Sequence, residues 1–132
     1  MRIDVLGVEF DNVTVEQAVA EGVRLMNTPG AHYVVTPNPE IVEVCRRDEA
    51  AMAAVRGADL VLADGIGVVY GAKILGTPLK GRVTGIGFAQ ALMAAMARDG
   101  KSLYLLGAKP GVAEAAAEKL RRDYPGLVIA GT

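Results

Sequence analysis

The chain has 132 residues, enough for one domain, and 52% of them are apolar, which excludes a disordered segment and indicates a packed, aliphatic core. The formal net charge is −1 with no basic block, so nucleic acid is not expected as a partner. A single cysteine excludes an intrachain disulfide, and no stretch reaches the roughly 20 apolar residues that a membrane span needs.

The N-terminal part predicts a hairpin and a helix. Two short β segments flank Gly7 in "RIDVLGVEFDNVT". Thr14, with Gln17 three residues later, is a capping-box pattern that opens a helix, and "NTPG" at 27–30 ends it.

Next comes a buried strand over 32–36, followed by Thr-Pro-Asn-Pro. Asn38 is suited to cap a helix whose first residue is Pro39, because the missing N–H of proline is harmless there. A further helix is expected to begin near Asp48.

The remaining chain continues to alternate strands and helices. The expected order is a strand at 59–64, a helix at 65–76, a short connection at 80–85, a helix at 86–100, a strand at 102–107, a helix at 109–124 and a strand at 127–131. Near-continuous apolar strands that alternate with helices are typical of a mostly parallel sheet flanked by helices. The fold class is therefore α/β, with a short N-terminal β hairpin.

The carboxyl ends of parallel strands share one edge, where α/β proteins bind ligands. The residues expected to converge there are Thr36-Pro37-Asn38, Ala63-Asp64-Gly65, Gly107-Ala108 and Gly131-Thr132.

Four of the polar or charged candidates have a structural and a functional interpretation. Asp64 is either the N-cap of the next helix or a carboxylate that serves as general base or sugar ligand, and the two roles are compatible. Thr36 and Asn38 either finish a strand and cap a helix or line a pocket. Arg82 is either a surface arginine or a phosphate ligand.

Other chemistries have weaker signals. The G-x-G-x-x-G and P-loop patterns are absent, although a helix beginning at 109–111 could hold a phosphate on its free N–H groups. His32 precedes its strand, far from the ligand edge, and Cys45 occupies a helix position that is expected to be buried. There is neither a Cys/His cluster nor an Asp-x-Asp pair, so no metal and no cofactor is expected.

Three segments taken together resemble one bacterial family. "TPNPEIV", "LADGIGVVYGAKILGTPLKGRVTG" and "LYLLGAKPGVAEAAAEKLRRDYPGLVIAGT" are similar, in order and spacing, to the WecG/TagA/CpsF glycosyltransferases. The resemblance implies a Rossmann-like domain over 1–132. It also implies an inverting, metal-independent transfer of a sugar onto an undecaprenyl-diphosphate-linked acceptor. In the TagA branch, N-acetylmannosamine moves from UDP-ManNAc to lipid-linked GlcNAc for wall teichoic acid.

By motif match, the resemblance makes Asp64 the general base. It places Thr36 and Asn38 in the substrate pocket and Arg82 beside it. Gly65, Gly107 and Ala108 are added as substrate-binding positions because they follow strand ends.

The chain departs from the family pattern at Ala63, where proline is usual, and at Gly87, where aspartate is common. The family continues beyond Thr132 with a basic C-terminal segment, so we expect these residues to be an N-terminal portion of a cytoplasmic enzyme that is peripheral at the inner face of the membrane through the missing part.

Alternatives stay open at this point. A non-catalytic domain that binds a nucleotide-sugar or oligomerises is the main one. An unfinished sheet edge at the chain's end suggests a homo-oligomer. A dinucleotide-dependent oxidoreductase is disfavoured because its fingerprint is absent.

Overall fold

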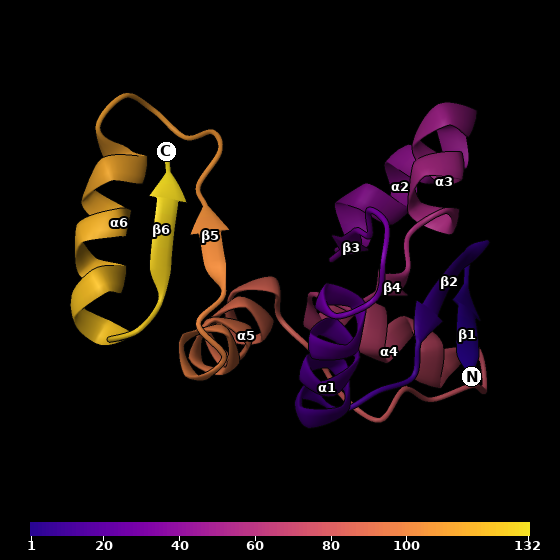
Figure 1. The fold of residues 1–132 in the computed structure, drawn as a ribbon. Helices are drawn as coiled ribbons and strands as arrows, with labels where there is room; N and C mark the ends of the chain where they lie inside the picture. The colour runs from indigo at the N-terminus through magenta and orange to yellow at the C-terminus, as the bar shows by residue number, and fades with distance from the viewer. The chain divides into compact units, whose positions relative to one another are not determined.

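The computed structural model describes all 132 residues, and the chain divides into two compact units, Met1–Phe88 and Ala89–Thr132. Figure 1 follows the chain from β1 at the N-terminus to β6 at the C-terminus. The expectation of a single domain over 1–132 stays a prediction.

In unit 1 the elements are β1 (Arg2–Val5), β2 (Val8–Asp11), α1 (Val15–Met26), β3 (Val34–Val35), α2 (Pro39–Arg47), α3 (Glu49–Arg56), β4 (Leu60–Val61) and α4 (Ile66–Ile74). Helix α5 (Gly85–Arg98) begins in unit 1, and unit 2 holds its remainder with β5 (Ser102–Tyr104), α6 (Val112–Asp123) and β6 (Val128–Gly131).

The N-terminal prediction is confirmed. β1 and β2 form an antiparallel hairpin whose turn residues, Leu6 and Gly7, have positive φ angles of 54° and 91°. Thr14 caps α1 with a full capping box: its Oγ1 accepts the Gln17 N–H, and its own N–H donates to Gln17 Oε1 at 3.0 Å. Both signals are local in sequence, which is why the pattern alone was sufficient to predict them.

The predicted α/β class is also confirmed, with strands that pair two by two. β3 and β4 are parallel, with Val34 opposite Leu60, and β5 and β6 are parallel, with Ser102 opposite Val128. Helix α6 lies alongside β6 within unit 2 (Figure 1).

The strands of unit 1 are shorter than the apolar runs at 32–36 and 59–64. Leu62 and Ala63 are buried and lie beyond the paired residues, although the Leu62 N–H still donates to the Val35 carbonyl at 2.9 Å. The prediction that 32–36 is a buried strand is wrong in part, because only Val34 and Val35 pair, both are half-buried, and Tyr33 is exposed.

The core of unit 1 is mostly aliphatic and lies among the hairpin, β4 and the helices α2, α3 and α4. Phe10 is its one aromatic residue and is fully buried. The cluster comprises Ile3, Val5, Val8, Phe10, Val42, Cys45, Val55, Ala58, Val61, Ala63, Val68 and Ala72. It includes Ala63, directly before Asp64, so the packed core supports the loop that carries this carboxylate.

In unit 2, α5 ends before Gly100, whose φ of 66° suits a glycine. Helix α6 begins at Val112, later than the expected 109, because Gly111 adopts a left-handed conformation (φ 84°) and forms the cap without a side-chain hydrogen bond. The residues of this unit buried from solvent are few: Ala95, Met96, Ala117 and Leu127.

None of the helices combines the length and the apolar character that crossing a membrane requires; the longest, α5, has 14 residues.

Candidate functional site

In unit 1, the two loops that follow β3 and β4 meet the segment that precedes α5. The Asp64 N–H donates to the Pro37 carbonyl at 3.2 Å, which joins the two strand-end loops. The Val83 N–H donates to the Ala63 carbonyl at 3.1 Å, which brings in the third segment. The convergence expected from the strand order is therefore present for the unit 1 residues.

Asp64 is half-buried at the centre of this arrangement. Its Oδ2 accepts the backbone N–H of Gly85 at 3.2 Å, and its Oδ1 accepts no hydrogen bond. The interpretation of Asp64 as the N-cap of α4 is wrong: Gly65 is the cap residue, with φ 112° and no side-chain cap bond. The positive φ of Gly65 turns the chain one residue later than expected, which leaves the carboxylate free to reach the start of α5.

Thr36 approaches the same glycine. A Cβ atom built on Gly85 would lie 3.1 Å from Thr36 Oγ1 and 3.4 Å from Asp64 Oδ2. The hydroxyl and the carboxylate thus both lie against the first residue of α5. The Thr36 side chain makes no recorded hydrogen bond, so its hydroxyl is available to a ligand.

Asn38 caps α2, as predicted: its Oδ1 accepts the Ile41 N–H at 2.9 Å, and Pro39 is the first helical residue. Only the side-chain oxygen is used, so the amide NH₂ remains a donor for a ligand. The ring of Pro39 packs against Gly65 and against Gly67 of α4, since a Cβ at Gly65 would lie 3.2 Å from its Cδ and one at Gly67 only 2.8 Å from its Cγ.

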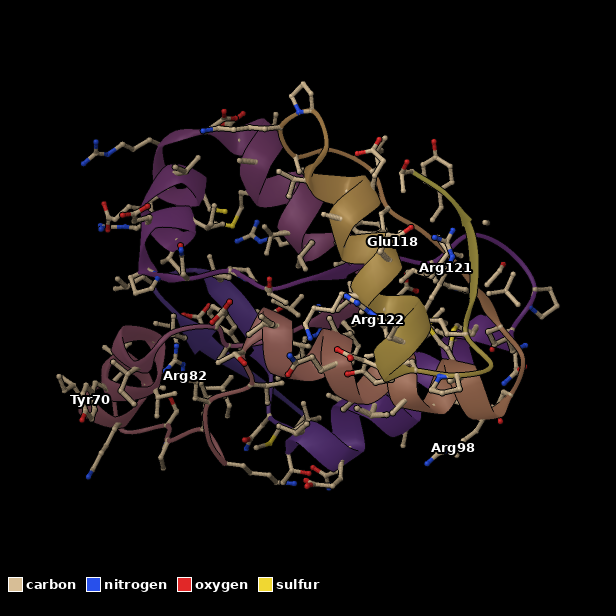
Figure 2. The ribbon with its side chains drawn as sticks, turned by 90° about the vertical axis from the view of Figure 1, so that its left-hand side faces the viewer. Tyr70, Arg82, Arg98, Glu118, Arg121 and Arg122 are labelled. Carbon is tan, nitrogen blue, oxygen red and sulfur yellow. The ribbon has the colours of Figure 1, made fainter.

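Arg82 lies in the connection between α4 and α5, as labelled in Figure 2. Its side chain is exposed and makes no hydrogen bond or ion pair within the chain. An exposed guanidinium without a partner fits both a surface arginine and a phosphate ligand, so both interpretations stay predictions.

Gly107 and Ala108 belong to unit 2, in the loop after β5. Both are exposed and have positive φ angles, 105° and 68°. That these two residues meet the unit 1 loops stays a prediction. The possible phosphate site at 109–111, at the start of the next helix, stays a prediction; the helix itself, α6, starts at Val112, with residue 111 as its left-handed cap.

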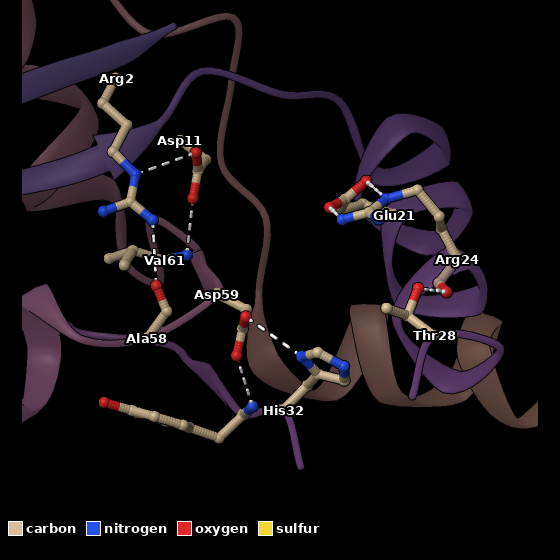
Figure 3. Close-up of polar contacts among 10 residues, drawn as sticks. Arg2, Asp11, Glu21, Arg24, Thr28, His32, Ala58, Asp59 and Val61 are labelled. Carbon is tan, nitrogen blue, oxygen red and sulfur yellow. Dashed lines mark hydrogen bonds and ion pairs between the residues drawn. The ribbon is translucent and has the colours of Figure 1, made fainter. Parts of the chain in front are cut away.

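The other polar clusters hold the fold together. Asp11 accepts the Val61 N–H at 2.8 Å and the Arg2 Nε at 3.2 Å, which fastens the hairpin to β4 (Figure 3). Asp59 accepts the Tyr33 N–H and bonds the His32 ring, and these two contacts lower the pKa of its carboxyl. The Asp11 cluster contacts β4, and the Asp59 cluster lies just before β3 and β4, so neither lies at the loops that follow these strands.

No group of three or more His, Cys, Asp or Glu side chains in the chain is close enough to hold a metal ion. Cys45 is buried, as predicted, and burial raises the pKa of its thiol, which makes it a poor nucleophile at neutral pH.

Two residues of this site, Thr84 and Gly85, had no role assigned from the sequence. Thr84 Oγ1 accepts the Gly87 N–H at 3.0 Å and its carbonyl accepts the Phe88 N–H, so Thr84 acts as the N-cap of α5. The Thr-Gly pair directly before an apolar helical period was the available signal.

A parallel strand pair with a carboxylate, a hydroxyl and a free amide at its carboxyl edge is typical of α/β proteins that bind small substrates. The sequence model of the glycosyl transferase WecG/TagA/CpsF family matches residues 3–132, and the chain belongs to this family.

The curated relatives are named N-acetylglucosaminyldiphosphoundecaprenol N-acetyl-beta-D-mannosaminyltransferase. Those of Staphylococcus aureus strains NCTC 8325 / PS 47 and COL are each 33% identical over an alignment of 132 positions that covers 98% of this chain and 52% of the relative. The chain thus spans about half the length of the curated relatives it matches.

Proposed function

We propose that these residues form the acceptor-activating part of a glycosyltransferase. The enzyme would transfer N-acetylmannosamine from UDP-ManNAc to undecaprenyl-diphosphate-linked GlcNAc, with inversion at the anomeric carbon and without a metal ion. The relatives' name, which states this kind of acceptor and sugar, supports the substrates. The observation that carries the proposal is the half-buried Asp64, which has one carboxylate oxygen bound and the other free.

In this mechanism Asp64 is the general base. The acceptor hydroxyl attacks the anomeric carbon, its proton passes to Asp64, and the bond from that carbon to the UDP oxygen breaks. A positioned base contributes about 10²–10⁴-fold to such a step. The free Oδ1 is the oxygen that accepts the proton, because Oδ2 is already occupied by the Gly85 N–H.

The other residues bind the substrates. Thr36 and Asn38 offer a hydroxyl and an amide to sugar hydroxyl groups. Arg82, which has no partner of its own, supplies positive charge to the departing diphosphate, and a guanidinium fits phosphate through two hydrogen bonds. In unit 1, Gly65 lets the substrate approach the backbone closely. Gly107 and Ala108 are proposed as substrate-binding positions of unit 2.

The lipid-linked acceptor implies work at a membrane surface. We propose that the enzyme acts in the cytoplasm at the inner face of the membrane, and that contacts with lipid come from the half of the relatives' length that this chain does not cover.

The test is sugar transfer by the natural full-length protein that contains these residues. UDP-ManNAc and a short-chain lipid-diphosphate-GlcNAc are the substrates, and Asp64→Asn is the variant. We expect transfer to fall about 10²–10⁴-fold with the unfolding midpoint little changed, because only a proton acceptor is lost. Asp99→Asn, an exposed aspartate of unit 2, is the matched control and should transfer normally.

Full activity in Asp64→Asn would rule out this residue as the base. Binding of UDP-ManNAc without turnover in the full-length parent would instead support the non-catalytic alternative.

A further inference from the structure

We infer that Gly85 is a positioning residue for the base: its N–H holds Asp64 Oδ2, and its lack of a side chain makes room for Thr36 beside that contact. The inference rests on the proposed function, since it assigns the orientation of the same carboxylate. It concerns a backbone group 21 residues from Asp64 in sequence.

The hydrogen-bond pattern at the start of α5 supports this role. The first N–H groups of a helix have no partner within the helix. Thr84 satisfies the N–H of Gly87 at 3.0 Å, and Asp64 satisfies the N–H of Gly85 at 3.2 Å. A carboxylate is also favoured at a helix N-terminus because the helix dipole is positive there. The Asp64 side chain is therefore held by a donor with a fixed direction.

The space at Gly85 supports it independently. A methyl group at this position would lie 3.1 Å from Thr36 Oγ1, which is a tight approach, and 3.4 Å from Asp64 Oδ2, which is an ordinary contact. Thr36 would have to move by a few tenths of an ångström. The glycine allows the hydroxyl and the carboxylate to share one face of the helix start.

For the reaction, the consequence is that the two oxygens of the Asp64 carboxylate have different roles. Oδ2 is held by Gly85 and fixes the rotation of the side chain, and Oδ1 is directed to the acceptor hydroxyl. Small displacements of a reacting group are costly, and a shift of 1 Å can reduce the rate about 10²-fold. Gly85 would thus act on kcat through Asp64 without touching substrate.

Three variants of the full-length protein separate the parts of this inference. Gly85→Ala adds the methyl group and keeps the N–H. Gly85→Pro adds three ring carbons and replaces the N–H that binds Asp64 Oδ2, and proline is tolerated as the first residue of a helix. Gly81→Ala is the matched control, because a Cβ at Gly81 meets nothing within 4 Å.

We expect Gly85→Ala to lower kcat about 10-fold to 10²-fold with a KM for UDP-ManNAc close to that of the parent, and Gly85→Pro to lower kcat further. Gly81→Ala should match the parent in both constants. Equal kcat values for the two alanine variants would overturn the positioning role, as would a loss confined to KM.

A second measurement does not depend on activity. In the ¹⁵N-labelled chain, the Gly85 amide proton should resonate downfield in the parent and move upfield in Asp64→Ala, which removes the acceptor. An unmoved Gly85 resonance would overturn the inference even if Asp64→Asn is inactive. If the Gly85 resonance moves in Asp64→Ala but Asp64→Asn transfers sugar fully, the hydrogen bond between Asp64 and Gly85 is supported and the role of Asp64 as base is rejected.

Discussion

The loops that follow the two parallel strand pairs of this protein differ in what they offer a substrate. After β3 and β4, the loops of unit 1 carry Thr36, Asn38 and Asp64, and backbone hydrogen bonds tie them together. After β5, the loop of unit 2 carries Gly107 and Ala108, which are exposed and have positive φ angles. The unit 1 loops carry polar side chains on a packed core, whereas these two residues of the unit 2 loop present mainly exposed backbone.

This difference shows that the same strand-end position can serve two purposes. A side chain such as Asp64 acts with precision only when its neighbours restrict it, and here the restriction comes from Gly85 and from the buried Ala63 before it. Residues without functional side chains need no such support. Four substitutions or pairs of substitutions test this comparison: two compare the units, and two test the packing and the charge that support unit 1.

The largest expected effect concerns the core of unit 1. Phe10→Ala should destabilise unit 1 by about 3–5 kcal/mol, because a fully buried aromatic side chain leaves a cavity. Hydrogen exchange read peptide by peptide should show lost protection in residues 1–88 and retained protection in 89–132. The counterpart, Leu127→Ala in unit 2, should give the reverse pattern. Equal loss of protection in both units after either substitution would show that they unfold together.

A smaller effect is expected where α4 meets Pro39. Gly67→Ala should cost about 1–3 kcal/mol, because its methyl group would lie 2.8 Å from Pro39 Cγ and force the loop after β3 to shift. Gly71→Ala in the same helix is the control. Its methyl group would meet Val5 at an ordinary 3.5 Å, and alanine is the better helix former by up to about 1 kcal/mol. Urea unfolding should show opposite signs, and two stabilising substitutions would contradict the close packing at Pro39.

Removing the cap residue of α2 in unit 1 or of α6 in unit 2 should lower the free energy of unfolding by about 1–2 kcal/mol. Asn38→Ala removes the side-chain bond to the Ile41 N–H and should cost about 1 kcal/mol. Gly111→Ala should cost about 1–2 kcal/mol for a different reason, since its φ of 84° is unfavourable for any residue with a Cβ. Only Asn38→Ala should also weaken transfer, because only that cap lies in the candidate site. Equal transfer by the two variants would remove Asn38 from the substrate pocket.

The smallest effect depends on pH. The pKa of Asp59 is lowered mainly by the hydrogen bond from the Tyr33 N–H and to a smaller extent by the hydrogen bond with the His32 ring, so its ionised form stabilises the fold. This contribution is complete above the unfolded-state pKa of about 3.9 and is lost as pH falls through the lower folded-state value. Asp59→Asn should therefore unfold at lower urea than the parent at pH 7, and the two midpoints should approach each other below pH 3.9. A constant gap across this range would argue against the ionised contact.

Much of the fold was predictable from the sequence because its signals are local. The capping box at Thr14, the Asn-Pro start of α2 and the glycine after α5 each act within a few residues, and all are found as expected. The strand lengths were overestimated, because apolar runs such as "DLVLAD" mark burial rather than the extent of the ladder. The onset of α6 was placed too early, since the left-handed conformation of Gly111 is not visible in helical periodicity.

The sequence by itself thus determined the α/β class, most helix starts and the choice of Asp64, Thr36 and Asn38 as candidates, through caps, period and strand-end position. Only the tertiary structure decided what Asp64 does: it leaves the cap of α4 to Gly65 and binds the N–H of Gly85. That contact joins segments 21 residues apart across the top of a packed core, and no local pattern encodes the distance between them. The physical reason is that a cap depends on neighbouring φ and ψ angles, whereas the orientation of this carboxylate depends on which distant backbone donor the packing brings within reach.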